Sequence, residues 1–151
     1  MTISMEERSS EIFVDSNFFI ALLNSEDSLY EKAKSISKKL AERDVSYVIS
    51  NLVFLEVITV TSMRSGRDTA VKGGNNLLQN SRVRLVHVDE ELHEKSWKIF
   101  QETEGKNVSF IDCSIIAAMK AEDISTLLTF DKTDFATLQK QYRFSLYKDL
   151  V

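Results

Sequence analysis

Short apolar segments of strand type alternate with longer segments of helical spacing along this chain, and this alternation constrains the fold most strongly. The strand-type segments are expected at about residues 11–15, 47–49, 82–88, 126–130 and 144–146. Helical segments lie between consecutive strands, and such crossover connections place neighbouring strands parallel. The pattern therefore predicts an α/β fold, a three-layer sandwich with a central, mainly parallel sheet of about five strands and helices on both faces.

The size and composition indicate one soluble globular domain. The chain has 151 residues, of which 43% are hydrophobic and 28% charged. We expect a single domain over residues 1–151, with a flexible polar start at residues 1–10. No apolar run approaches the roughly 20 residues that span a bilayer, and residues 1–8 lack the pattern of a signal peptide, so a cytoplasmic protein without membrane contact is expected.

The charge and the single cysteine exclude some classes of function. A net charge of −4 disfavours indiscriminate binding to nucleic acid, although it leaves room for a local basic patch. The lone Cys113 excludes an internal disulfide, and its apolar surroundings favour a thiol in the core.

Helix boundaries are indicated by capping residues. Ser28-x-x-Glu31 has the form of a capping box that opens a helix running to about Leu40. Ser50 or Asn51 can cap the next helix, residues 52–60, which is apolar nearly all round and is therefore expected to be buried.

Acidic residues occur where the expected elements meet one edge of the sheet. Asp15 and Asp131 each follow a strand, Asp112 begins a helix, and Glu56 lies about one and a half turns inside the helix after the second strand. In a parallel sheet, the strand ends and the following helix starts face the same edge, where ligands bind. We therefore expect these acids, which are distant in sequence, to converge there.

Structural explanations are available for most of these acids. Asp15 can cap the following helix, Ser109-x-x-Asp112 fits a capping box, and Asp131-x-x-Asp134 fits one loosely. Glu56 is harder to explain in this way, because an acid inside an apolar helix is costly to bury unless it is paired or binds a cation.

A divalent cation would explain the cluster. Basic residues are scarce near these acids in sequence, and carboxylates brought together without bases repel one another unless a cation relieves the repulsion. Oxygen ligands favour Mg²⁺ or Mn²⁺ over zinc. Such an ion can activate water and neutralise charge on a phosphate, so phosphodiester hydrolysis is the natural chemistry.

Four sequence motifs contain these acids and together cover essentially the whole chain. They are Phe13-Val14-Asp15-Ser16-Asn17, residues 51–57 (NLVFLEV), residues 109–118 (SFIDCSIIAA) and residues 127–135 (LLTFDKTDF). Together these motifs resemble the PIN domain family, in particular its small stand-alone members, which include the toxins of VapBC toxin–antitoxin pairs.

The resemblance implies a fold, an activity and a set of site residues. It implies a PIN-like fold, an endoribonuclease dependent on Mg²⁺ or Mn²⁺, a homodimer, and an antitoxin whose basic residue enters the acidic site. Asn17 and Thr129 match polar positions beside that site, and Asp134 matches a further acid. The acids carried over as catalytic and metal-binding residues are Asp15, Glu56, Asp112 and Asp131.

Alternatives remain open at this stage. A non-catalytic PIN-like scaffold that binds RNA or a protein partner is possible, although the complete acidic set argues against it. Arg64, Arg67 and Lys72 are candidates for contacts with RNA phosphates, or they form a solvated helix end. Trp97 and Phe100 are expected in the core or at a dimer contact.

Overall fold

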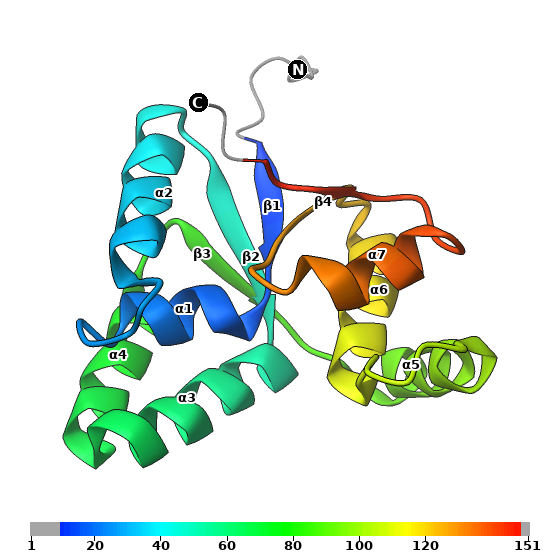
Figure 1. The fold of residues 1–151 in the computed structure, drawn as a ribbon, viewed down its shortest axis with the longest axis horizontal. Coiled ribbons are helices and arrows are strands. Elements are labelled where there is room, and N and C mark those ends of the chain that lie inside the picture. Colours follow the sequence, from blue (N-terminus) through cyan, green and yellow to red (C-terminus); the bar gives the residue numbers. More distant parts are fainter. Residues whose placement is uncertain (1–9, 149–151) are drawn as a thin grey trace, which may run out of the picture.

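The computed structural model describes residues 10–148, and these residues contain a five-stranded sheet in which every pair of neighbouring strands is parallel. The strand order is β3-β2-β1-β4-β5 (Figure 1). The predicted sheet is confirmed, whereas the expected flexible start lies outside the described residues except for residue 10. The strands are β1 (Glu11–Val14), β2 (Ser46–Ser50), β3 (Val83–Val86), β4 (Thr126–Leu128) and β5 (Ser145–Leu146).

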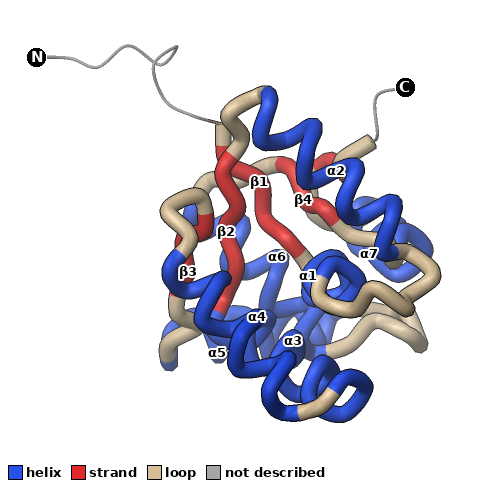
Figure 2. Tube along the Cα trace, turned by 90° about the vertical axis from the view of Figure 1, so that its left-hand side faces the viewer, coloured by secondary structure: helices blue, strands red, loops and turns tan. Residues whose placement is uncertain are grey.

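Helices surround this sheet and complete the predicted α/β architecture (Figures 1 and 2). Helix α1 packs on α2 and α3, α3 packs on α4, and α5 packs on α6. None of the helices within residues 10–148 is long and apolar enough to cross a membrane. The helices are α1 (Ser16–Leu22), α2 (Tyr30–Glu42), α3 (Asn51–Ser65), α4 (Arg67–Gln79), α5 (Glu90–Glu102), α6 (Phe110–Glu122) and α7 (Lys132–Gln139).

Side-chain caps begin several helices, but the predicted cap at Ser28 is wrong. Ser50 caps α3 by accepting a hydrogen bond from the Val53 amide at 3.0 Å, as expected. The predicted capping box at Ser28 is absent, because α2 begins at Tyr30 without a side-chain cap. The Asp27 carboxylate instead accepts the Leu29 amide at 2.8 Å, and this local turn replaces the helical start.

The core lies between the sheet and its helices, and it includes Phe13, Val48 and Leu127 from the central strands. Cys113 is buried in this core, as expected for a structural thiol.

One expectation about burial is wrong, and another is narrowed to one of its alternatives. Helix α3 is not buried all round, because α1 and α4 cover only part of it and leave Leu55 61% and Met63 81% exposed. Trp97 is 51% exposed and therefore lies outside the core, where its ring stacks on Phe100. A dimer contact at Trp97 stays a prediction.

The sheet topology brings the carboxyl ends of β1 and β4 together. The Asp15 amide, which follows β1, donates to the Leu128 carbonyl of β4 at 2.9 Å. Residues after these two strands therefore share one edge of the sheet, beside the beginnings of α1, α3 and α6 (Figure 1).

Candidate active site

Asp15 is a buried acid at the end of β1. Its side chain is held by the Ser16 amide at 2.8 Å and by the Thr129 hydroxyl, which donates to Oδ2 at 2.8 Å. Asp15 thus caps α1, as expected, and also faces the sheet edge. Burial raises its pKa to about 7 against the lowering effect of the Thr129 hydrogen bond, and the charges of Asp112 and Glu56 raise it further.

Asp112 is held at the start of α6 by the predicted capping box. The Ser109 amide donates to Asp112 Oδ2 at 3.0 Å, and the Asp112 amide donates to Ser109 Oγ at 3.1 Å. Burial raises the pKa of Asp112 to about 6, and the negative charges of Asp131 and Asp134 add to the shift. The capping role and a place in the acidic cluster are therefore compatible.

Ser16 links Asp15 to Glu56. The Ser16 hydroxyl donates to Glu56 Oε1 on α3, and Ser16 Oγ also lies 3.5 Å from Asp15 Oδ1. Glu56 is half-buried rather than enclosed in the apolar core. The structure thus explains how an acid is tolerated in an apolar helix, since its carboxylate reaches a polar neighbour at the sheet edge.

Asn17 and Thr129 connect the ends of β1 and β4. Asn17 accepts the Phe130 amide at 3.1 Å and donates to Thr129 Oγ1 at 3.1 Å and to Asp15 Oδ2 at 3.3 Å. Thr129 Oγ1 also accepts the Asp131 amide at 3.0 Å. These bonds fix the backbone of Asp131 relative to Asp15.

Asp131 and Asp134 lie close together at the start of α7. A hydrogen bond with Asp131 raises the pKa of Asp134, and so do partial burial and the charge of Asp131. Their side chains form no capping hydrogen bond for α7, so the loosely predicted cap at Asp131 is wrong.

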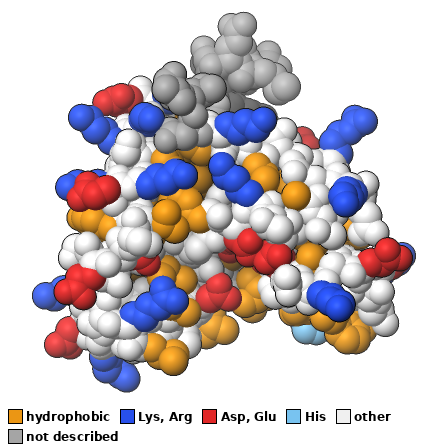
Figure 3. Space-filling view, in the orientation of Figure 1, with side chains coloured by type: hydrophobic (Ala, Val, Ile, Leu, Met, Phe, Trp, Pro, Cys, Tyr) orange, Lys and Arg blue, Asp and Glu red, His pale blue; other side chains and the backbone are white. Residues whose placement is uncertain are grey.

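The acids face one cavity of about 410 Å³. Figure 3 shows acidic side chains gathered near the centre of the face on which this cavity opens. The structure therefore brings the predicted acids together. The predicted site residues that line the cavity are Asp15, Asn17, Glu56, Arg64, Asp112, Asp131 and Asp134.

The predicted basic residues separate into two groups. Arg64 lines the cavity one helical turn beyond Val60 and two beyond Glu56, and its guanidinium lies 3.9 Å from the Asp27 carboxylate. Arg67 and Lys72 lie on α4 and do not line the cavity.

Some residues of the cavity were missed by sequence reasoning. Ser16 and Ser109 adjoin predicted acids or caps, so their positions carried a usable signal. Asp27 and Asn107 lie in loops, and no periodicity or spacing in the sequence indicates where a loop returns to the sheet.

The donor chemistry of the cavity fits a divalent cation. Its lining contains several carboxylates and a single cationic side chain, Arg64. Burial and mutual repulsion raise the pKa values of carboxylates when no cation compensates their negative charge. Within residues 10–148, no group of three or more His, Cys, Asp or Glu side chains is arranged to hold a metal ion, so the fit rests on the donor types.

Comparisons with known proteins agree with this architecture. The PIN domain family matches residues 12–141. The chain is 31% identical over 120 residues to a protein of Mycobacterium tuberculosis named 23S rRNA-specific endonuclease VapC20, covering 80% of this chain and 88% of that protein.

Solved structures show the same fold. The crystal structure of VapC20, described as a toxin that cleaves the sarcin-ricin loop, aligns with a TM-score of 0.75 at 27% identity, covering 87% of this chain and 95% of that one. VapBC2 from Rickettsia felis, bound to a promoter DNA fragment, aligns with a TM-score of 0.65 at 17% identity, covering 91% and 99%. FitAcB from Neisseria gonorrhoeae aligns with a TM-score of 0.64 at 19% identity, covering 91% and 96%.

Proposed function

The chain belongs to the PIN domain family, and on that premise we propose that it is an endoribonuclease whose acidic cavity binds Mg²⁺ or Mn²⁺. The observation that carries the proposal is the convergence of acids from β1, α3, α6 and the end of β4 on one cavity. The similarity to an RNA-specific endonuclease supports RNA as the substrate and cleavage at internal bonds of the RNA strand.

The proposed roles follow from the contacts of each acid. Asp15, Glu56, Asp112 and Asp131 would hold the ion, with Asp134 as a further oxygen donor. When bound, the ion supplies the positive charge that activates water and neutralises charge on the scissile phosphate.

The polar neighbours would position these acids. Thr129 and Asn17 keep Asp15 in a fixed orientation through their hydrogen bonds to Oδ2. Ser16 orients Glu56 through its hydroxyl. Such supporting contacts fix the direction of the oxygen atoms that would meet the ion.

Phosphate binding would come from basic side chains outside the acidic cluster. Arg64 stands at the cavity wall and is proposed to contact an RNA phosphate near the cleaved bond. Arg67 and Lys72 are proposed to contact RNA farther along α4.

The proposed biological setting is that of a toxin. The similar structures include toxin–antitoxin complexes, which supports an antitoxin partner for this chain. A homodimer is proposed because it is expected for small PIN proteins, and a cytoplasmic location because residues 1–8 lack the pattern of a signal peptide. A scaffold without turnover is the alternative, and the complete set of acids at the cavity disfavours it.

Cleavage of a circular RNA tests the proposed activity. Wild-type protein with Mn²⁺ or Mg²⁺ should open the circle, which only an endonuclease can do, and EDTA should stop the reaction. Asp112→Asn should lower the rate by about 100-fold or more, because it removes a charged ligand while keeping an oxygen for the Ser109 cap. Glu31→Gln, an exposed acid on α2, is the matched control. Unchanged cleavage by Asp112→Asn would overturn the proposal.

A further inference from the structure

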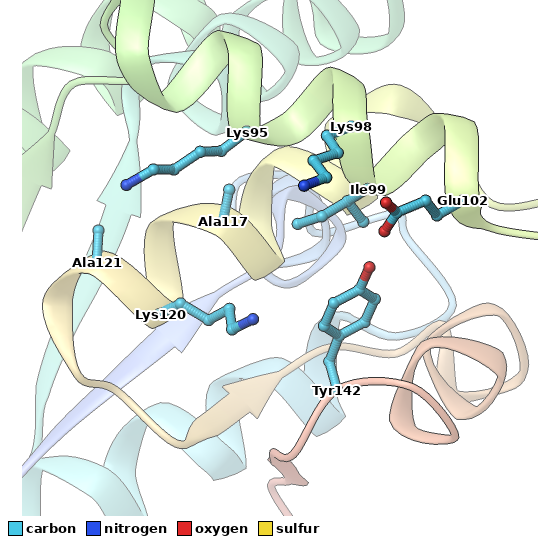
Figure 4. Close-up of a pocket in the computed structure, with 8 residues that line it drawn as sticks. All are labelled: Lys95, Lys98, Ile99, Glu102, Ala117, Lys120, Ala121 and Tyr142. Atoms are coloured by element: carbon cyan, nitrogen blue, oxygen red, sulfur yellow. The ribbon is translucent and has the colours of Figure 1, made fainter.

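A second cavity, distinct from the acidic one, lies between α5, α6 and the segment after α7. It measures about 400 Å³ (Figure 4). Its apolar lining consists of the buried Ile99 and Ala117 and the exposed Ala121. Figure 4 shows the side chains of Lys98 from α5 and Lys120 from α6 directed into the space between the two helices and Tyr142. We call this space the lysine cavity.

The lysine cavity is positively charged on a protein that is negatively charged overall. Lys95, Lys98 and Lys120 line it together with one acid, Glu102. A neighbouring cavity of about 250 Å³ shares Lys120 and Tyr142 and adds Arg143 and Asp123. Four cationic and two acidic side chains thus line the combined surface, whereas the whole chain carries a net charge of −4.

The lysines of this cavity differ in how far their charge is already compensated. Lys95 pairs with Glu91 at 3.1 Å, and the Lys120 amino group lies over the Tyr142 ring at 5.0 Å from its centre. Lys98 forms no ion pair within residues 10–148. All three lysines are exposed, so an anion can reach their amino groups without a rearrangement of the core.

The composition of the lysine cavity suits a nucleotide rather than a bare ion. Ammonium groups at its rim can bind a phosphate, and the apolar wall with the half-buried Tyr142 ring offers a surface to a base. The volume also lies within the range of cavities that hold small organic ligands.

The two cavities are placed so that an extended ligand can use both. Asp112 lines the acidic cavity and Lys120 the lysine cavity, and they are eight residues apart on α6, about 12 Å of helix rise. The connection between α5 and α6 also joins them, since Glu102 lines one cavity and Asn107 the other. A ligand that touches both must extend over several nucleotides.

We propose that the lysine cavity is a second RNA-binding site, which holds a nucleotide and its backbone phosphate away from the cleaved bond. This inference rests on the proposed endoribonuclease function and specifies how the substrate is held. An acidic cleavage site repels the RNA backbone, so the binding energy has to come from cationic side chains elsewhere. The lysine cavity supplies them.

The salt dependence of RNA binding tests the inference. Binding of a labelled, unstructured single-stranded RNA of about 30 nucleotides is measured in EDTA, where cleavage does not interfere, over a series of salt concentrations. In the double variant Lys98→Gln/Lys120→Gln, the affinity should fall about tenfold. The slope of log K against log salt should become less steep by about 0.7, because the site would hold one phosphate and each phosphate contact to single-stranded nucleic acid contributes about 0.7.

Matched variants separate charge from structure. Lys38→Gln, an exposed lysine on α2, should leave affinity and slope unchanged. Lys98→Arg/Lys120→Arg should retain most of the affinity, because it preserves both charges. Thermal unfolding followed by circular dichroism shows that each variant is folded.

Substrate length gives a second readout. The double glutamine variant should raise KM for the long RNA without changing kcat. It should leave cleavage of a dinucleotide unaffected, because the only phosphate of a dinucleotide is the one that is cleaved. If wild type cleaves no RNA but the double glutamine variant still loses RNA affinity, the lysine cavity is an RNA-binding site and the proposed nuclease activity is refuted. Unchanged affinity and slope would overturn the inference, and so would an effect on self-association or protein binding alone.

Discussion

At the scale of single residues, Asp15 combines an observed structural role with its proposed role as a metal ligand. Its carboxylate caps α1 by accepting a hydrogen bond from the Ser16 amide, and it also accepts a hydrogen bond from the Thr129 hydroxyl at 2.8 Å. Capping a helix and belonging to the acidic cluster, the two interpretations that the sequence left open, are thus compatible, because a carboxylate has several lone pairs. The cost is the burial of a charge, which raises the pKa of Asp15 to about 7.

The raised pKa of Asp15 predicts how stability depends on pH in the metal-free protein. The folded protein binds a proton at Asp15 more tightly than the unfolded chain does, since burial raises the pKa from 3.8 to about 7. The stability from this group is therefore complete below the unfolded pKa and is lost as the pH rises toward 7. Relative to Asp15→Asn, wild type should lose roughly 3 kcal/mol of unfolding free energy between pH 4 and pH 7.

Urea unfolding in EDTA at pH 4, 5.5 and 7 measures this difference. Glu31→Gln, an exposed acid on α2, should show no comparable trend against wild type. A constant difference between wild type and Asp15→Asn across this range would show that the folded protein does not raise the pKa of Asp15.

The sequence predicted where several residues of the cavity lie, for a physical reason. Asp15 and Asp131 follow parallel strands, and parallel strands direct their carboxyl ends to one edge. Asp27 also reaches the cavity, but it does so through a loop of consecutive turns, whose path depends on tertiary contacts. The roles of all these residues stay predictions.

At the scale of elements, two of the helices that carry a cavity acid, α3 and α6, have a serine cap at their start. Ser50 caps α3 and Ser109 caps α6, so Glu56 and Asp112 lie at set distances from a strand end or a fixed loop. Helix α5 has a similar cap, Asp89, but its residues do not line the acidic cavity. The caps of α3 and α5 therefore form a matched pair.

Removing these two caps should affect stability alike and activity differently. Ser50→Ala and Asp89→Ala should each lower the free energy of unfolding by about 1 kcal/mol. At saturating RNA, only Ser50→Ala should slow cleavage, by roughly tenfold, because the first turns of α3 position Glu56, whereas α5 lines the lysine cavity and would affect KM. Equal effects of both variants on cleavage, measured where both are folded, would contradict a positioning role for the α3 cap.

Element boundaries were predicted better than the burial of their faces. The apolar residues of α3 indicated a helix buried on all sides, yet Leu55 and Met63 are exposed. Composition reports how apolar a helix is, whereas the number of neighbours that cover it is set by tertiary packing. The same limit applies to Trp97, which was expected in the core or at a dimer contact and which lies on the surface of α5.

At the scale of the whole molecule, the alternation of strands and helices predicted the sheet and its parallel direction. The order β3-β2-β1-β4-β5 did not follow from that pattern, because local periodicity does not determine which strands become neighbours. This order puts β1 beside β4 and so places Asp15 beside Thr129. The acidic cavity is thus a product of topology as much as of its individual residues.

Isothermal titration with Mn²⁺ tests most directly whether this cavity is a metal site. Wild type and the exposed-acid control Glu31→Gln should bind Mn²⁺ with the same affinity, whereas Asp15→Asn and Asp112→Asn should bind at least about tenfold more weakly, because each removes a charged oxygen ligand. Absence of Mn²⁺ binding by wild type, or equal binding by all these proteins, would contradict the account.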